Sequence, residues 1–307
     1  MRPRFRPRGT HRPGAASGRQ PELWAALLFL APLVMLVAVF VVVPVLGTLI
    51  DSLFLDVSFL ERRFVGLENF TRLFADPGFR QALRFTGLFV AVSVPLEIAL
   101  GLAVALVLNA PCRLRGLLRA CALLPWAIPA AVSGRVFELV YNYSFGAANA
   151  LLTRTGLVEA PVNWLGSDAG AFLAIVAADL WRTTPFAAII LLAGLAVIPQ
   201  ELYRQARIDR AGVWQRFVRI TLPLLKPVLL IACVLRVIDA LRVFDLVFVL
   251  TGGGPGGATT SVALYAFDYF AAADFGFGAA VGVVLFFIAL GLSVAVLKAG
   301  RVEKGLL

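Results

Sequence analysis

Residues 23–50 read LWAALLFLAPLVMLVAVFVVVPVLGTLI, a stretch of 28 residues without a charged side chain. A bilayer core is about 30 Å thick and takes roughly 20 apolar helical residues to cross. The stretch exceeds that length, and it also exceeds the apolar region of a cleaved signal peptide. We therefore predict that it forms an uncleaved membrane span close to the N-terminus.

Five further apolar runs follow this stretch. They cover approximately residues 85–108, 117–141, 170–198, 224–250 and 276–297. Hydrophobic residues make up 60% of the 307 residues and charged residues 15%, which leaves too little polar material for the surface of a soluble protein. The runs are apolar on every face, whereas transmembrane β-strands would alternate over about ten residues. The sequence thus predicts an all-α polytopic membrane protein with six transmembrane helices.

The basic residues gather in alternate segments between these runs. Eighteen of the 28 Lys and Arg residues lie in residues 1–19, 109–119, 199–227 and the C-terminal tail, and only six lie in the other loops. The positive-inside rule therefore predicts that both termini and the 109–119 and 199–227 loops are cytoplasmic. We expect residues 1–20 to be a disordered basic tail and residues 21–307 to form the transmembrane domain. Because no basic face is interleaved with aromatic residues, nucleic acid is not an expected partner.

The chain lacks the residues on which common catalytic and cofactor sites depend. Its single histidine, His11, lies in the basic tail, which argues against metal sites and histidine catalysis. Its three lysines follow Leu225, Leu297 and Glu303, whereas a phosphate-binding P-loop needs glycine immediately before lysine. We therefore expect neither a cofactor nor an ATPase site in this chain.

Two segments on the predicted outer side carry local signals. Residues 142–169 are long enough for a short interfacial helix, whose aromatic side chains would suit the headgroup level. Residues 252–257, GGGPGG, predict a turn with positive φ angles, which glycine adopts without steric cost.

The predicted cytoplasmic loop at residues 199–223 reads PQELYRQARIDRAGVWQRFVRITLP. This pattern indicates a polar helix, a tight turn near residues 209–212, a second amphipathic helix, and then Leu222-Pro223 at the start of the next span. A short pair of helices that protrudes from the membrane suits docking into a groove on a partner protein.

The same loop resembles the EAA coupling loop of binding-protein-dependent ABC permeases, which ends in Ile-x-Leu-Pro. It departs from the family pattern at two points, with Arg204-Gln205-Ala206 in place of Glu-Ala-Ala and Asp209-Arg210-Ala211 in place of Asp-Gly-Ala. Since arginine restricts a backbone that glycine leaves free, we expect Gly212 to take over the role of the turn glycine. The resemblance implies that the residues coupling transport to the ATPase are Arg204, Gln205, Ala206, Asp209, Arg210, Ala211 and Gly212.

Further stretches resemble the carbohydrate-uptake subgroup of these permeases. They are residues 124–129 (LPWAIP), 193–199 (AGLAVIP), 236–245 (RVIDALRVFD) and 250–255 (LTGGGP). The resemblance implies the transmembrane domain of a type I ABC importer, which passes a sugar such as trehalose or maltose across the cytoplasmic (inner) membrane of a prokaryote. The partners it implies, besides membrane lipid, are a second permease subunit, two ATP-binding subunits and an extracytoplasmic sugar-binding protein.

Several ionisable residues fall at membrane depth, where a charge costs about 3 kcal/mol on insertion scales and therefore needs a partner or water. They are Glu97, Asp179, Arg182, Arg236, Asp239 and Arg242. Residues 236, 239, 242 and 245 alternate in sign at i+3 spacing, which allows pairing along one side of a helix. Two interpretations remain open: ion pairs that lock helices together, or a polar pathway for sugar hydroxyls.

The family resemblance implies substrate contacts at Asp179, Arg182, Thr183, Phe186, Arg236, Asp239 and Ala240. We predict that Asp179, Arg182, Arg236 and Asp239 face one cavity between the fourth and fifth spans, with Phe186 beside it to stack on a pyranose ring. Carboxylate and guanidinium groups form directed hydrogen bonds that suit hydroxyls. The alternative function is a secondary active transporter that uses Glu97 or Asp179 as a proton relay. A membrane-embedded enzyme is disfavoured, since the sequence offers no nucleophile and base set.

Overall fold

The computed structural model describes residues 19–110 and 113–301. The predicted disordered tail, residues 1–20, lies outside the described residues except for Arg19 and Gln20, with which the first helix begins. The chain divides into two compact units, residues 1–48 and residues 49–307, and each is described by itself.

The first unit is helical throughout its described part. It contains α1 (Arg19–Val37), a π-helix (Ala38–Val42) and most of α2 (Val43–Asp51). The π-helical turn ends two residues before Pro44. Proline lacks an N–H and clashes with the carbonyl four residues earlier, so the regular helical hydrogen bonds cannot continue there. The apolar part, Leu28–Asp51, is long enough to cross a bilayer, which agrees with the predicted first span.

The second unit begins with small, ordered elements in the predicted outer loop. A hairpin pairs β1 (Phe54–Leu55) with β2 (Arg63–Phe64), and α3 (Glu68–Ala75) follows. The buried Asn69 ties α3 to the preceding chain, because its Nδ2 donates to the carbonyls of Ser52 and Phe54, each at 2.9 Å. Asp76 then caps α4 by accepting the N–H groups of Gly78 and Phe79. For this reason α4 begins before the apolar run that starts at residue 85.

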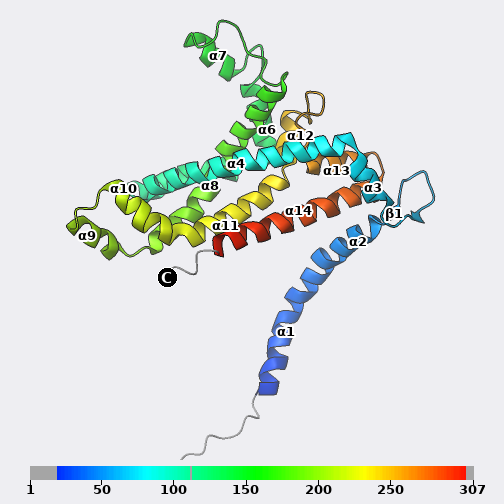
Figure 1. Cartoon of the computed structure of the whole chain (residues 1–307), viewed down its shortest axis with the longest axis horizontal. Helices are drawn as coiled ribbons and strands as arrows, with labels where there is room; N and C mark the ends of the chain where they lie inside the picture. The colour runs from blue at the N-terminus through cyan, green and yellow to red at the C-terminus, as the bar shows by residue number, and fades with distance from the viewer. Residues whose placement is uncertain (1–18, 111–112, 302–307) are drawn as a thin grey trace, which may run out of the picture. The chain divides into compact units, whose positions relative to one another are not determined.

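Four long helices run side by side in this unit: α4 (Pro77–Asn109), α8 (Asp168–Val197), α11 (Leu222–Leu241) and α14 (Phe275–Arg301) (Figure 1). The contact between α4 and α8 is the most extensive, and α11 packs against the other three. Gly101 allows the close approach of α4 to α8, because a Cβ there would lie 2.9 Å from the Cβ of Ala187. Small residues at such crossings are typical of packed membrane helices.

Two of the predicted spans are broken. Residues 117–141 form α5 (Arg115–Ala127) and α6 (Ala130–Val140), which meet at an angle of 89°. The break falls at Ile128-Pro129, because a residue before proline is held in an extended conformation. Residues 224–250 form α11 and α12 (Asp245–Leu250), with residues 242–244 between them.

The predicted count of six spans is not confirmed. In the described residues, four helices are long and apolar enough to cross a bilayer, or five if α5 and α6 together form one span. The predicted fifth span is not among them because α11, although 20 residues long, carries three charged residues, Lys226, Arg236 and Asp239.

The remaining elements agree with the local predictions. Within residues 142–169 the chain forms α7 (Ala147–Arg154). The glycine-rich stretch is a turn in which Gly252, Gly253, Gly256 and Gly257 have positive φ angles. It leads into α13 (Val262–Ala271), which packs on α14.

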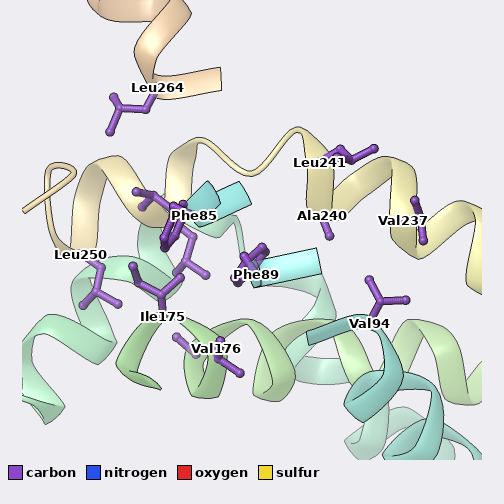
Figure 2. Packing of buried hydrophobic residues seen from close by; sticks show 13 residues of the cluster. Phe85, Phe89, Val94, Ile175, Val176, Val237, Ala240, Leu241, Leu250 and Leu264 are labelled. Carbon is purple, nitrogen blue, oxygen red and sulfur yellow. The ribbon is translucent and has the colours of Figure 1, made fainter. Parts of the chain in front are cut away.

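The buried core of the second unit consists of three apolar clusters. One joins the end of α4, the end of α8 and the start of α11, and another joins α3, the start of α4, α13 and the start of α14. The cluster between them includes Phe85 and Phe89 of α4, Ile175 of α8 and Val237 of α11 (Figure 2). It also includes Ala240, which borders the cavity described next.

Candidate functional site

A polar cavity of about 380 Å³ lies where α8, α11 and the chain between α11 and α12 meet. Charged side chains from these three segments and from the first residue of α12 line it: Asp179, Arg182, Arg236, Asp239, Arg242 and Asp245. Ala240 also lines the cavity, together with Ala130 from α6 and Phe244. The structure therefore brings five of the seven residues predicted to contact substrate to one cavity.

Arg236 is the centre of the charged network. Its Nε and Nη2 donate to the two carboxylate oxygens of Glu97, the second at 3.2 Å, and the side chains of both residues are almost wholly buried. Its Nη1 donates to Oδ2 of Asp239 at 3.3 Å, and its Nη2 lies 3.5 Å from Oδ2 of Asp179. One guanidinium thus faces carboxylates from α4, α8 and α11, and the two-armed pair with Glu97 is the geometry in which such pairs are strongest.

The network continues from the buried pair toward the surface. Asp239, whose side chain is 47% exposed, also accepts a hydrogen bond from Nη2 of Arg242 at 3.1 Å. Asp245, the fourth member of the i+3 row, makes no ion pair with any described residue. It does not continue the row because α11 ends at Leu241 and the chain leaves the helical path there.

Two charged side chains at the cavity have unsatisfied polar atoms. Oδ2 of Asp179 and Nε of Arg182 are buried and have no hydrogen-bond partner among the described residues. The closest approach between these two side chains, from Nη2 of Arg182 to Oδ1 of Asp179, is 3.7 Å. Leaving such atoms unbonded costs about 1–3 kcal/mol each, or more for charged groups, so a hydrogen-bonding group that reaches them would be stabilised.

Thr183 and Phe186 lie outside the set of described residues that line the cavity. The buried Thr183 donates from its Oγ1 to the carbonyl of Asp179 at 2.6 Å, within its own helix. Phe186 stacks on Trp126 of α5, with ring centroids 5.4 Å apart. Phe186 follows the lining residue Arg182 by one helical turn but does not itself line the cavity, and the aromatic ring that does is that of Phe244.

Sequence reasoning missed the roles of Glu97 and Phe244 in this site. Glu97 was noticeable as a charge within an apolar run, but its partner is 139 residues away in the chain. Phe244 carried no signal of its own, because it faces the cavity only through the break between α11 and α12.

The predicted coupling loop forms the expected pair of helices. It consists of α9 (Gln200–Ile208), α10 (Val213–Arg216) and a π-helix (Phe217–Thr221) that leads into α11 and again lies just before a proline, Pro223. The hydroxyl groups of Tyr203 and Thr221 are 2.9 Å apart, which fixes α9 against the start of the long helix.

The turn after α9 is closed by a Schellman motif. The N–H of Ala211 donates to the carbonyl of Ala206 at 2.8 Å, and that of Arg210 donates to the carbonyl of Arg207 at 3.1 Å. Arg210 itself adopts the left-handed conformation, with φ +58°, at the position where glycine is usual. Gly212 has φ −64° and precedes α10, so the expectation that it takes over the role of the turn glycine is wrong.

The tip of the coupling loop exposes large apolar side chains. Ile208, Val213 and Trp214 are each more than 70% exposed. The predicted coupling residues surround this tip: Arg204, Gln205 and Ala206 lie on α9, and Asp209, Arg210, Ala211 and Gly212 form the turn.

Comparisons with known proteins place the cavity and the coupling loop within one family. Residues 97–300 match the family described as the inner membrane component of binding-protein-dependent transport systems. The trehalose/maltose transport system permease protein MalF of Thermococcus litoralis is 51% identical over 278 residues, which cover 90% of this chain and 94% of that protein. The sulfoquinovosyl glycerol transport system permease protein SmoG of Agrobacterium fabrum is 37% identical, and the match covers 91% of each chain.

The fold is also similar to that of an ABC transporter subunit of known structure. A chain in the crystal structure of a bacterial ABC transporter involved in the import of the acidic polysaccharide alginate superimposes with a TM-score of 0.80, over 92% of this chain and 97% of that one. The sequence identity is 22%, so this likeness supports the fold alone. Taken with the sequence matches, it shows that this helical, multi-pass inner-membrane protein belongs to the family of inner membrane components of binding-protein-dependent transport systems, the permeases of ABC transporters.

Proposed function

We propose that this chain is the permease subunit of an ATP-driven importer that passes a sugar across the cytoplasmic membrane. The observation that carries the proposal is the polar cavity between α8 and α11, which lies within the family match. The two relatives are named for the transport of trehalose and maltose and of sulfoquinovosyl glycerol. A sugar such as trehalose or maltose is therefore the substrate we propose.

The chemistry of the cavity supports a polyhydroxylated substrate. A sugar hydroxyl is both a donor and an acceptor, so it can donate to a carboxylate and accept from a guanidinium. Asp179 and Arg182 retain a buried acceptor and a buried donor for such bonds, and Asp239 is half exposed beside them. We propose that Thr183 and Phe186 contribute indirectly, through the shape of α8 next to the cavity.

Energy for transport would come from other subunits. The three lysines are not preceded by glycine, so we propose a transport subunit without its own ATPase site. The proposed assembly contains a second permease subunit, two ATP-binding subunits and an extracytoplasmic sugar-binding protein. The exposed tip at Ile208, Val213 and Trp214, with the residues of the adjoining turn, is the surface we propose for docking on an ATP-binding subunit.

We further propose that both termini and the coupling loop are cytoplasmic. The packing of the second unit supports a common side for the 109–119 and 199–227 loops, because the end of α4, the end of α8 and the start of α11 share one apolar cluster. The basic segments at residues 113–119 and 204–226 adjoin that cluster. We also propose that residues 21–307 act as one transmembrane domain, with residues 199–223 as its coupling loop and residues 1–20 as a tail.

The family match supports this function and not the alternative of a secondary active transporter. Glu97, one of the two carboxylates suggested as a proton relay, is held by both arms of Arg236.

The proposal is tested by reconstituting the chain with its partner subunits in proteoliposomes that contain ATP. We expect labelled maltose or trehalose, delivered by the binding protein, to accumulate only when ATP is hydrolysed, and accumulation to continue when a protonophore is added. Uptake that needs a proton gradient but no ATP would contradict the proposal and favour the alternative.

A further inference from the structure

The cavity contains one aromatic side chain among the described residues that line it. Phe244 lies between α11 and α12, in the short segment that interrupts the predicted fifth span. Its neighbours in the lining are Asp245 on one side in sequence and Val243 on the other. An apolar ring thus borders a space that is otherwise rich in charge.

Other aromatic rings hold Phe244 in place. It stacks on Phe248 of α12 with ring centroids 5.5 Å apart and planes 14° apart. Phe267 of α13 contacts it at 5.0 Å with a tilt of 54°, and it also contacts Phe248 at 5.7 Å. Because Phe248 and Phe267 come from two different helices, they hold the side chain of Phe244 in one position without any ligand.

Charged groups of both signs surround the ring. Three aspartates and three arginines line the cavity, and Glu97 behind Arg236 adds a fourth carboxylate. A ligand with a net charge would meet groups of its own sign in such a lining, whereas an uncharged ligand with many hydroxyls could bond to groups of either sign. The space offers such a ligand hydrogen bonds on the charged side and an apolar contact at Phe244.

We infer that Phe244 is a specificity-determining residue, which packs against the C–H face of an uncharged sugar ring while Asp179 and Asp239 bond to its hydroxyls. The inference rests on the proposed function. A sugar ring has a flat face of C–H groups, and aromatic side chains offer a large, rigid apolar surface of matching shape. The ring that the family resemblance offered for this contact, Phe186, is instead stacked on Trp126.

The test compares four variants in the reconstituted complete transporter. Phe244→Leu and Phe244→Met remove the ring, and Phe244→Tyr keeps it. Phe270→Leu is the matched control, because Phe270 lies on α13, is 41% exposed and contacts Phe275, away from the cavity. The readouts are the amount of assembled complex, ATP hydrolysis without substrate, and the uptake of labelled maltose.

We expect both non-aromatic variants to assemble and hydrolyse ATP as the parent does but to take up maltose about three- to ten-fold more slowly, the factor expected for an aromatic contact. Phe244→Tyr and Phe270→Leu should stay within about two-fold of the parent. Unchanged uptake in Phe244→Leu and Phe244→Met, or an equal loss in Phe270→Leu, would overturn the inference. A parent transporter that moves no sugar would instead count against the proposed function.

Discussion

Glu97 and Arg236 lie 139 residues apart in the sequence and form a two-armed hydrogen-bonded pair in which neither side chain is appreciably exposed. The pair joins α4 to α11. Asp179 of α8 lies 3.5 Å from the same guanidinium, so a third helix is joined to the pair. Burying the two charges in this way is tolerable only when both members of the pair are present. The pair therefore fixes the relative positions of the helices beside the cavity.

Removing the carboxylate of Glu97 should destabilise the protein. Glu97→Gln leaves Arg236 with Asp179 and Asp239 alone, so we expect a loss of about 3 kcal/mol, the lower end of the range for a broken buried pair. The measurement is the amount of protein in the membrane and its thermal unfolding in detergent. Glu138→Gln is the control, since Arg135–Glu138 is an exposed pair worth about 1 kcal/mol or less. Equal stability of the two variants would show that the buried pair does not hold the helices.

The crossing of α4 and α8 should be intolerant of bulk. In Gly101→Leu the new side chain would meet Ala187 and the backbone nitrogen of Ala188, so we expect a loss of about 1–3 kcal/mol from overpacking. At Gly87 on the same helix an added Cβ would meet nothing within 4 Å, so Gly87→Leu should be neutral. The check is the unfolding temperature of both variants. If Gly101→Leu is as stable as the parent, α4 and α8 are not packed as closely as the structure has them.

The turn of the coupling loop should become more rigid when Arg210 is replaced by glycine. A non-glycine residue in the left-handed region costs about 1 kcal/mol, so Arg210→Gly should slow amide exchange in residues 204–212 about five-fold. Gly212→Ala should change little, because Gly212 has a negative φ and open space around it. Faster exchange in Arg210→Gly, or a larger effect in Gly212→Ala, would contradict the assigned turn geometry.

Asp209→Lys should separate ATP hydrolysis from transport. Asp209 lies at the end of α9, next to the exposed apolar tip that we propose docks on an ATP-binding subunit. Reversing its charge should lower sugar uptake while the assembled protein stays in the membrane. Sugar import at the normal rate by this variant would refute the coupling role.

The long elements of the fold were predictable from the sequence because membrane spans need long apolar runs. The apolar runs at residues 85–108, 170–198 and 276–297 locate α4, α8 and α14, and the polar loop at 199–223 forms the predicted helix pair. The break at Ile128-Pro129 was not predicted, since prolines are also tolerated inside membrane helices. The break at residues 242–244 was missed because hydrophobicity does not report where a helix ends.

The candidate site was predictable only in part. Because a charge at membrane depth is costly, the sequence indicated that Asp179, Arg182, Arg236 and Asp239 would need partners. The structure brings these four side chains to one cavity. The partner of Glu97 depends on how α4 packs on α11, which no local pattern records. The presence of Phe244 in the lining likewise depends on tertiary structure, because this residue lies in the break between α11 and α12.

The most direct test of the account is the behaviour of Asp239→Asn, measured for protein abundance and sugar uptake in one strain. Asp239 is half exposed and shares Arg236 with the buried Glu97, so the variant keeps the main pair. We predict near-normal abundance together with uptake reduced about tenfold or more, the factor for a lost hydrogen bond to a charged group. Reduced abundance without any change in uptake per assembled transporter would contradict the account, because the charges would then only hold the helices together.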